Sequence, residues 1–275
     1  MSSRRQFLQA LGVAGSGVLL GRWPAWAGGP GVRYITIMGA TSCISYVKAV
    51  LPEWESTHRG VKVAVTGGGS YAGLHALALA QAEIAMADLA PPKSMAVPVR
   101  RYLLGRLPIV LAAWPHIGVG RLSWGQAGAV LAGDIVNWRQ VGGADVPVVT
   151  VSRPESSGAR EVVQQRILGK RRFSPDSIIQ LSNGAVLRTV METPGAVGYL
   201  EATAPMHRVR ILGMGSRSFS PQAWRLWPLY AEPSLYVRVQ APEEVRNLAV
   251  FLQGRPERQD FGIYFDQRPG QADAR

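Results

Sequence analysis

The stretch Val148-Val149-Thr150-Val151-Ser152-Arg153-Pro154-Glu155-Ser156-Ser157-Gly158-Ala159-Arg160-Glu161 decides how the rest of the chain is interpreted. Its β-branched run predicts a buried strand that stops at a turn containing Pro154, and residues 160–168 have helical character. A strand–turn–helix junction of this kind points backbone N–H groups and the positive end of a helix dipole at one spot, beside Arg153. The stretch therefore suits a small oxyanion, although an ordinary structural turn accounts for it equally well.

The composition allows one large domain or two small ones. The chain has 275 residues, of which 47% are hydrophobic, and a formal net charge of +12. Such a charge favours anionic partners, but no block of Lys and Arg with interleaved aromatic residues stands out in the sequence. We therefore expect a solvated basic surface and no nucleic-acid partner.

The cysteine and histidine pattern argues against metal and disulfide chemistry. Cys43 is the only cysteine, so no intramolecular disulfide is possible, and the four histidines are scattered along the chain. Zinc sites need ligands at characteristic spacings, so we expect no metal and no other cofactor. Cys43 itself is interpreted as a small buried residue, with a redox-sensitive thiol as the alternative.

Residues 1–27 have the features of an export signal. Residues 3–9 contain the pair Arg4-Arg5 and resemble the twin-arginine signature, and Ala25-Trp26-Ala27 is a small-x-small cleavage site. The apolar run at residues 7–20 is shorter than the roughly 20 residues that a membrane span needs. We expect cleavage near Ala27 and a periplasmic mature protein.

Strand–helix units fill the region after the signal. Strands are predicted at residues 33–38, 61–65 and 84–87, and helices at residues 44–55 and 71–82, the second with Ser70 as its N-cap. The third strand places Asp88 at its carboxyl end. This order predicts a parallel α/β sheet, which binds ligands outside the carboxyl ends of its strands.

The second half continues the α/β pattern. An apolar strand at residues 107–113 is expected to cross into another lobe. Helices are predicted at residues 122–131, 184–192 and 242–253, a turn into a strand at residues 193–199, and a strand within residues 224–239.

Six segments, taken together and in this order, resemble the phosphate-binding proteins of ABC transporters, the PstS-like branch of the type II periplasmic binding proteins. They are residues 39–41 (Gly-Ala-Thr), 67–70 (Gly-Gly-Gly-Ser), 83–88 (Glu-Ile-Ala-Met-Ala-Asp), 133–143, 152–158 and 183–199. The resemblance implies an α/β fold of two lobes joined by two crossing strands, with a ligand cleft between them. Lobe one would hold residues 28–107 plus 227–275, and lobe two would hold residues 108–226.

The resemblance also implies a set of phosphate-binding residues. Asp88 would select the ligand, because a carboxylate repels an anion that has no proton to donate: monohydrogen phosphate has one and sulfate has none. Arg153 would supply a charge-assisted contact. The full set is Thr41, Ser42, Ser70, Asp88, Arg153, Ser157, Gly158 and Ala159.

Ala159 departs from the family's pattern, which usually has threonine after Ser-Gly. One lost neutral hydrogen bond costs about 0.5–1.5 kcal/mol. Arg160 follows directly, either as a partial compensation or as a residue that points to solvent.

The resemblance implies a monomeric binding protein that delivers phosphate to an inner-membrane ABC permease and catalyses no reaction. Because Ala159 departs from the family's pattern, a receptor or sensor that binds another oxyanion and has no transporter remains an alternative function. A secreted phosphatase or esterase is the alternative from another class. Ser70 and Ser157 are flanked by glycine, but neither lies in a Gly-x-Ser-x-Gly motif.

Overall fold

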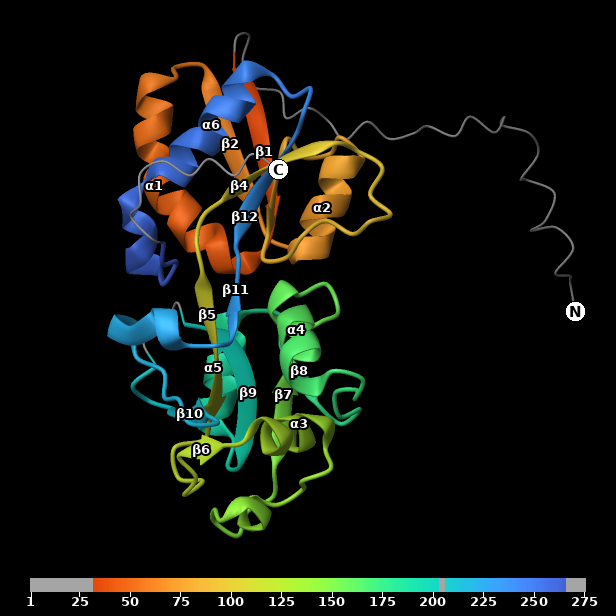
Figure 1. The fold of residues 1–275 in the computed structure, drawn as a ribbon. Helices are drawn as coiled ribbons and strands as arrows, with labels where there is room; N and C mark the ends of the chain where they lie inside the picture. The colour runs from red at the N-terminus through yellow and green to blue at the C-terminus, as the bar shows by residue number, and fades with distance from the viewer. Residues whose placement is uncertain (1–31, 203–205, 266–275) are drawn as a thin grey trace, which may run out of the picture.

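Two β-sheets organise the computed structural model, which describes residues 32–202 and 206–265 (Figure 1). The export signal predicted for residues 1–27 lies outside these ranges. Within them, no helix has both the length and the apolar character that crossing a membrane requires.

The first sheet has the strand order β2-β1-β3-β12-β4. Strands β1, β2 and β3 are parallel, as predicted, whereas β12 runs antiparallel to both β3 and β4. The sheet is therefore mixed, because its fourth strand is formed by chain that returns from the other lobe. The strands are β1 (Arg33–Gly39), β2 (Val61–Thr66), β3 (Ile84–Ala87), β4 (Val99–Leu103) and β12 (Ser234–Arg238).

Helices cover both faces of this sheet (Figure 1). Helices α1 (Ile44–Thr57) and α6 (Glu243–Gly254) each bury one apolar stripe at helical spacing against one face. Helix α2 (Ser70–Ala78) packs on the other face. Strand β3 lies between these layers and is fully buried, which explains its continuous run of apolar residues.

Helix α2 differs from its prediction at both ends. Ser70 is the first helical residue rather than the N-cap, which is Gly69, and the Ser70 hydroxyl makes no capping bond. It instead accepts the backbone N–H of Asp88 at 3.0 Å. The helix ends at Ala78 because Ala80 has a positive φ of 57°, which a right-handed helix cannot accommodate.

The second sheet has the order β6-β10-β5-β9-β7-β8, with β11 paired to β5. Its core holds the fully buried Trp138, whose indole N–H donates to the Gly195 carbonyl at 2.8 Å. The strands are β5 (Leu107–Ala113), β6 (Arg121–Leu122), β7 (Val149–Ser152), β8 (Ile178–Ile179), β9 (Ala196–Glu201), β10 (Arg210–Met214) and β11 (Tyr230–Ala231).

Helices α3 (Trp124–Ala132), α4 (Gly158–Val163) and α5 (Asn183–Glu192) pack around the second sheet. The helix predicted for residues 160–168 begins two residues earlier and changes to a π-helix over Gln164–Leu168.

Two chain segments connect the lobes where β5 and β11 lie side by side (Figure 1). The chain enters the second lobe along β5 and returns to the first sheet between β11 and β12. Trp227, Leu229 and Ala231 pack in the second lobe's core, although the sequence interpretation assigned residues from 227 onward to the first lobe. The reason is local: the Trp227 indole N–H donates to the Ile109 carbonyl at 2.7 Å, and β11 pairs with β5.

Candidate functional site

Three loops of the first lobe converge on the second lobe. The one-turn helix Thr41–Cys43 follows β1, Ser70 begins α2 after β2, and Asp88 follows β3. Because the carboxyl ends of parallel strands meet at one sheet edge, these residues are brought together. Ser42, Ser70 and Asp88 are all buried there.

Asp88 is held by the two serines. The Ser42 hydroxyl donates to Oδ1 at 2.8 Å, and the Ser70 hydroxyl donates to Oδ2 at 3.5 Å. Burial raises the pKa of Asp88 to about 7, and the charge of Glu201 adds to this rise, while Ser42, Arg153 and Ser70 oppose it. The carboxyl group can therefore hold a proton near neutral pH.

This raised pKa predicts how stability depends on pH. In the unfolded state Asp88 loses its proton near its ordinary pKa of 3.8, whereas in the folded state it keeps the proton up to about pH 7. The folded state is therefore progressively destabilised, relative to the unfolded state, as the pH rises from about 4 to about 7. Replacing Asp88 with asparagine should raise the free energy of unfolding of the unliganded protein at pH 8 by about 2 kcal/mol. The melting temperature should rise by roughly 5 °C at that pH, and by much less near pH 4. Thermal unfolding in phosphate-free buffer tests this. The exposed Asp145→Asn variant is the control, and an equal effect at both pH values would contradict the prediction.

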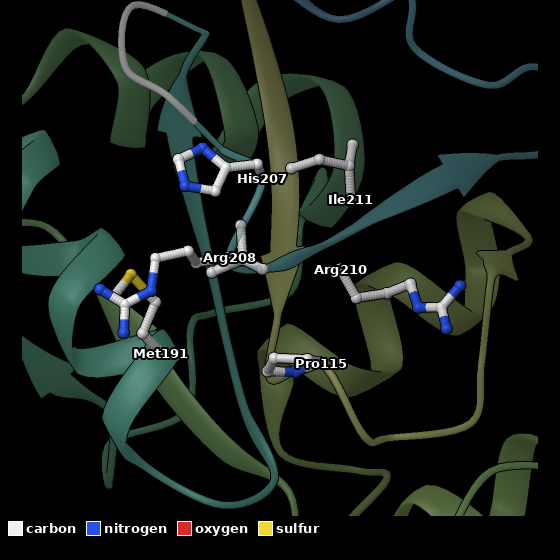
Figure 2. Close-up of a pocket in the computed structure, with 7 residues that line it drawn as sticks. Pro115, Met191, His207, Arg208, Arg210 and Ile211 are labelled. Carbon is white, nitrogen blue, oxygen red and sulfur yellow. The ribbon is translucent and has the colours of Figure 1, made fainter.

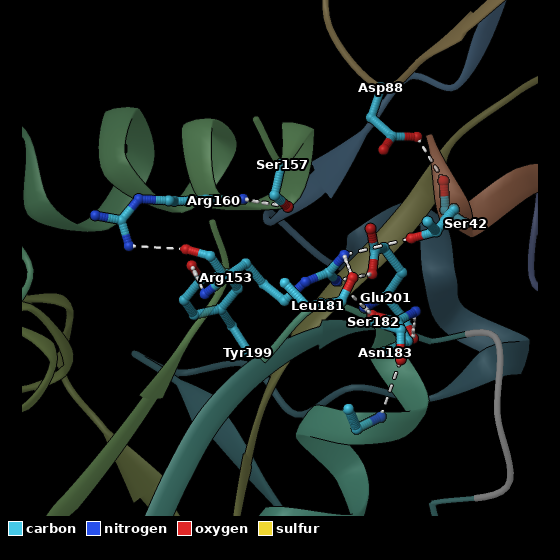
Figure 3. A network of polar contacts seen from close by, with 12 residues as sticks. Ser42, Asp88, Arg153, Ser157, Arg160, Leu181, Ser182, Asn183, Tyr199 and Glu201 are labelled. Carbon is cyan, nitrogen blue, oxygen red and sulfur yellow. Dashed lines mark hydrogen bonds and ion pairs between the residues drawn. The ribbon is translucent and has the colours of Figure 1, made fainter. Parts of the chain in front are cut away.

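Arg153 reaches from the second lobe to the first and is only 4% exposed (Figure 3). Its Nη2 donates to the Thr41 hydroxyl and to the Leu181 carbonyl, both at 3.3 Å. Its Nη1 donates to Asn183 Oδ1 at 3.3 Å and lies 3.7 Å from Glu201 Oε2. Nε is buried and has no hydrogen-bond partner in the described ranges, so one N–H of the guanidinium remains for a ligand oxygen.

The backbone of Arg153 is fixed by its own lobe. Its N–H donates to the Tyr199 hydroxyl at 3.1 Å, and Tyr199 also lies 2.9 Å from the Ser152 hydroxyl. Arg160 Nη1 donates to the Ser152 hydroxyl at 2.6 Å and to the Arg153 carbonyl at 3.1 Å, and its guanidinium lies over the Phe173 ring. The expectation that Arg160 points to solvent is therefore wrong. Arg160 supports the turn that carries Arg153.

Gly158 lies where the two lobes pack against each other, with no room for a side chain. A Cβ at this position would lie 2.6 Å from the Ser70 hydroxyl oxygen and 2.8 Å from the Asp88 Cβ. On the opposite side of the contact, a Cβ on Gly69 would lie 2.5 Å from the Ser156 carbonyl oxygen. Any side chain at either glycine would push the lobes apart.

Ser157 and Ala159 complete the predicted set. The Ser157 hydroxyl accepts the Arg160 N–H at 3.4 Å and so caps α4, which leaves its O–H free to donate. The Ala159 methyl group is fully buried in the second lobe's hydrophobic core. The structure thus brings all eight predicted residues to the lobe junction, although Ala159 can offer a ligand only its backbone.

Two residues of this network were missed by the sequence interpretation, Glu201 and Asn183. Glu201 ends β9 and is 2% exposed, and Asn183 Oδ1 accepts from both Arg153 Nη1 and the Glu201 N–H. Glu201 carried a signal similar to that of Asp88, an acidic residue directly after an apolar run.

Cys43 lies next to this network. It is fully buried, and burial followed by the charge of Asp88 raises its pKa well above the ordinary value. Its interpretation as a small buried residue is confirmed. Across the described ranges, no three or more His, Cys, Asp or Glu residues are grouped so that they could hold a metal ion.

A separate cavity of about 680 Å³ lies on the second lobe (Figure 2). It is open, basic and lined by none of the eight predicted residues. Its lining residues are Pro115, Met191, His207, Arg208, Val209, Arg210 and Ile211.

Comparisons with known proteins agree with this architecture. The model of the PBP superfamily domain matches residues 24–213. Phosphate-binding protein PstS from Bacillus subtilis is 24% identical over 226 residues, which cover 80% of this chain and 75% of that protein. The Clostridium perfringens structure described as a phosphate ABC transporter substrate-binding protein with bound phosphate has a TM-score of 0.77 at 20% identity and covers 85% of this chain and 100% of that one. The structure of an ABC-type phosphate transport receptor from Vibrio cholerae has a TM-score of 0.68 at 23% identity, and the match covers 82% of this chain and 96% of that one. The predicted two-lobed α/β fold is confirmed.

Proposed function

The chain belongs to the PBP superfamily, and from this membership we propose that it binds inorganic phosphate between its two lobes. The observation that carries the proposal is that a buried guanidinium, Arg153, and a buried carboxyl group, Asp88, both lie at the lobe junction. The relatives named phosphate-binding proteins support the same ligand.

The two side chains set opposite demands on a ligand. Arg153 offers charge-assisted donors to an oxyanion, whereas an ionised Asp88 accepts only a ligand oxygen that carries a proton. Monohydrogen phosphate satisfies both demands, and sulfate fails the second above about pH 7, where the Asp88 carboxyl group is ionised. We assign the remaining contacts to Thr41, Ser42, Ser70, Ser157 and the backbone of Gly158 and Ala159.

We further propose that the protein is the substrate-binding component of an ABC phosphate transporter. The export signal at residues 1–27 supports a periplasmic location after cleavage near Ala27. The delivered phosphate would pass to an inner-membrane permease, and the binding protein would act as a monomer.

Replacing Asp88 with asparagine tests the assignment of the ligand. A site built around a ligand hydroxyl rejects the analogue that lacks it by about 10⁴-fold. We expect the wild type to prefer phosphate over sulfate by this order, and Asp88→Asn to lose at least about a hundredfold of that preference. Calorimetric titration with both anions at about pH 8, above the Asp88 pKa of about 7, measures it, with Asp145→Asn as the control. Equal rejection of sulfate by wild type and Asp88→Asn would refute the role of Asp88.

A receptor or sensor for another oxyanion is the second candidate, because Ala159 brings no hydroxyl to the site. Titration of the mature protein with phosphate, arsenate, molybdate and sulfate separates the two candidates. Heat from another anion, with none from phosphate, would favour the second.

A further inference from the structure

We propose that Arg160 is a positioning residue of the anion site: its side chain holds the turn that carries Arg153 and thereby sets the affinity for the ligand. The inference rests on the proposed binding of phosphate and assigns a further residue to that same site. Arg160 acts through Arg153 rather than on the anion, because both hydrogen bonds from its guanidinium in the described ranges go to its own lobe.

The side chain of Arg160 reaches back from α4 to the end of β7 (Figure 3). Its Nη1 donates to the Ser152 hydroxyl at 2.6 Å and to the Arg153 carbonyl at 3.1 Å. Its backbone N–H donates to the Ser157 hydroxyl at 3.4 Å. Arg160 therefore contacts both ends of the turn between β7 and α4. Within the part of the chain that the structure describes, the Arg153 carbonyl accepts a hydrogen bond from Arg160 alone.

Tyr199 holds the same turn from β9. Its hydroxyl accepts the Arg153 N–H at 3.1 Å and lies 2.9 Å from the Ser152 hydroxyl. The Phe173 ring connects the two supports, since its centroid lies 4.2 Å from the Arg160 guanidinium carbon and 5.5 Å from the Tyr199 ring. Ser152, Arg153 and Tyr199 are each at most 4% exposed, so solvent offers little replacement for a lost donor.

Removing the Arg160 side chain would take a donor from both the Ser152 hydroxyl and the Arg153 carbonyl, and the turn would shift to find others. The Arg153 guanidinium moves with its backbone. Its hydrogen bond to the Thr41 hydroxyl across the junction is already long, at 3.3 Å. A small shift of the turn therefore takes the guanidinium out of hydrogen-bond range of an anion held between the lobes.

The Arg160→Met variant tests the proposal, because methionine fills similar space with neither a charge nor a donor. We expect its phosphate affinity to be about tenfold below that of the wild type. Arg160→Lys keeps the charge and a shorter donor, so its affinity should lie between the two. The exposed Arg166→Met variant, on the turn that continues α4, should bind as the wild type does. Calorimetric titration measures all of these dissociation constants.

A double-mutant cycle separates positioning from a loss of charge or of fold stability. When Arg153 is already alanine, no guanidinium is left to position, so adding Arg160→Met should weaken binding by less than about twofold. A charge that attracts the anion from a distance, or a general loosening of the second lobe, would cost the same factor in both backgrounds. The same cycle with Arg160→Lys, the milder change, should give a smaller coupling of the same sign.

The contrary outcomes are distinct. An equal loss in both backgrounds, or wild-type affinity in Arg160→Met, would overturn the inference and leave phosphate binding intact. Absence of phosphate binding by the wild type would overturn both.

Discussion

Replacing Arg153 with alanine is expected to weaken phosphate binding by two to three orders of magnitude. Truncating one partner of a buried, hydrogen-bonded charge pair costs about 2–5 kcal/mol, and about 1.4 kcal/mol corresponds to tenfold in affinity. The loss exceeds the lower end of this range because Asp88 and Glu201 would then face the anion with no buried cation between them.

Calorimetric dissociation constants for Arg153→Ala and Arg153→Lys measure this effect. Lysine keeps the charge but not the planar fork that also contacts Thr41 and Asn183, so an intermediate affinity is expected. Arg139→Ala, which removes an exposed arginine of the same lobe, should bind as the wild type does. A near-normal dissociation constant for Arg153→Ala would place Arg153 outside the anion's contacts.

Replacing Gly158 with alanine should have the second-largest effect, a loss of about one to three orders of magnitude in affinity. The added Cβ would stand 2.6 Å from the Ser70 hydroxyl oxygen, so the lobes would have to stop short of their closed separation. Hydrogen bonds from one lobe to an anion held by the other would then lengthen beyond their range, and each such bond to a charged group contributes about 1.5–3 kcal/mol.

Gly184→Ala is the matched control, because Gly184 also lies in the first turn of a second-lobe helix and a Cβ there meets nothing within 4 Å. Both variants should melt close to the wild-type temperature in the absence of ligand, since the strain of Gly158→Ala is relieved by opening the cleft. Unchanged phosphate affinity in Gly158→Ala would mean that binding does not require the closed contact.

Much of the site could be predicted from local patterns. Asp88 was placed correctly because an acidic residue directly after a short apolar strand lies at the edge where parallel α/β sheets bind ligands. Arg153 and Gly158 were placed by the strand–turn–helix pattern that contains them. Each of these inferences uses residues that are neighbours in the chain.

The failures involve partners that are distant in the chain. Ser70 has the sequence features of an N-cap, but its hydroxyl bonds the Asp88 backbone from another strand end. Arg160 follows the site residues directly, yet it packs over Phe173 and supports the turn behind them. Neither outcome follows from helix propensity, because side-chain hydrogen bonds to other strands compete with local ones.

The sequence by itself determined the three parallel strands of the first lobe, the loops that could bind an anion and the residue types in them, since periodicity and turn chemistry are local properties. It did not predict β4 or β10. Only the tertiary structure decided which charges share one buried space. It placed Glu201 from β9 beside Arg153 and close enough to raise the pKa of Asp88 across the lobe junction. Electrostatic coupling depends on distance and burial, and both are set when the two lobes pack together.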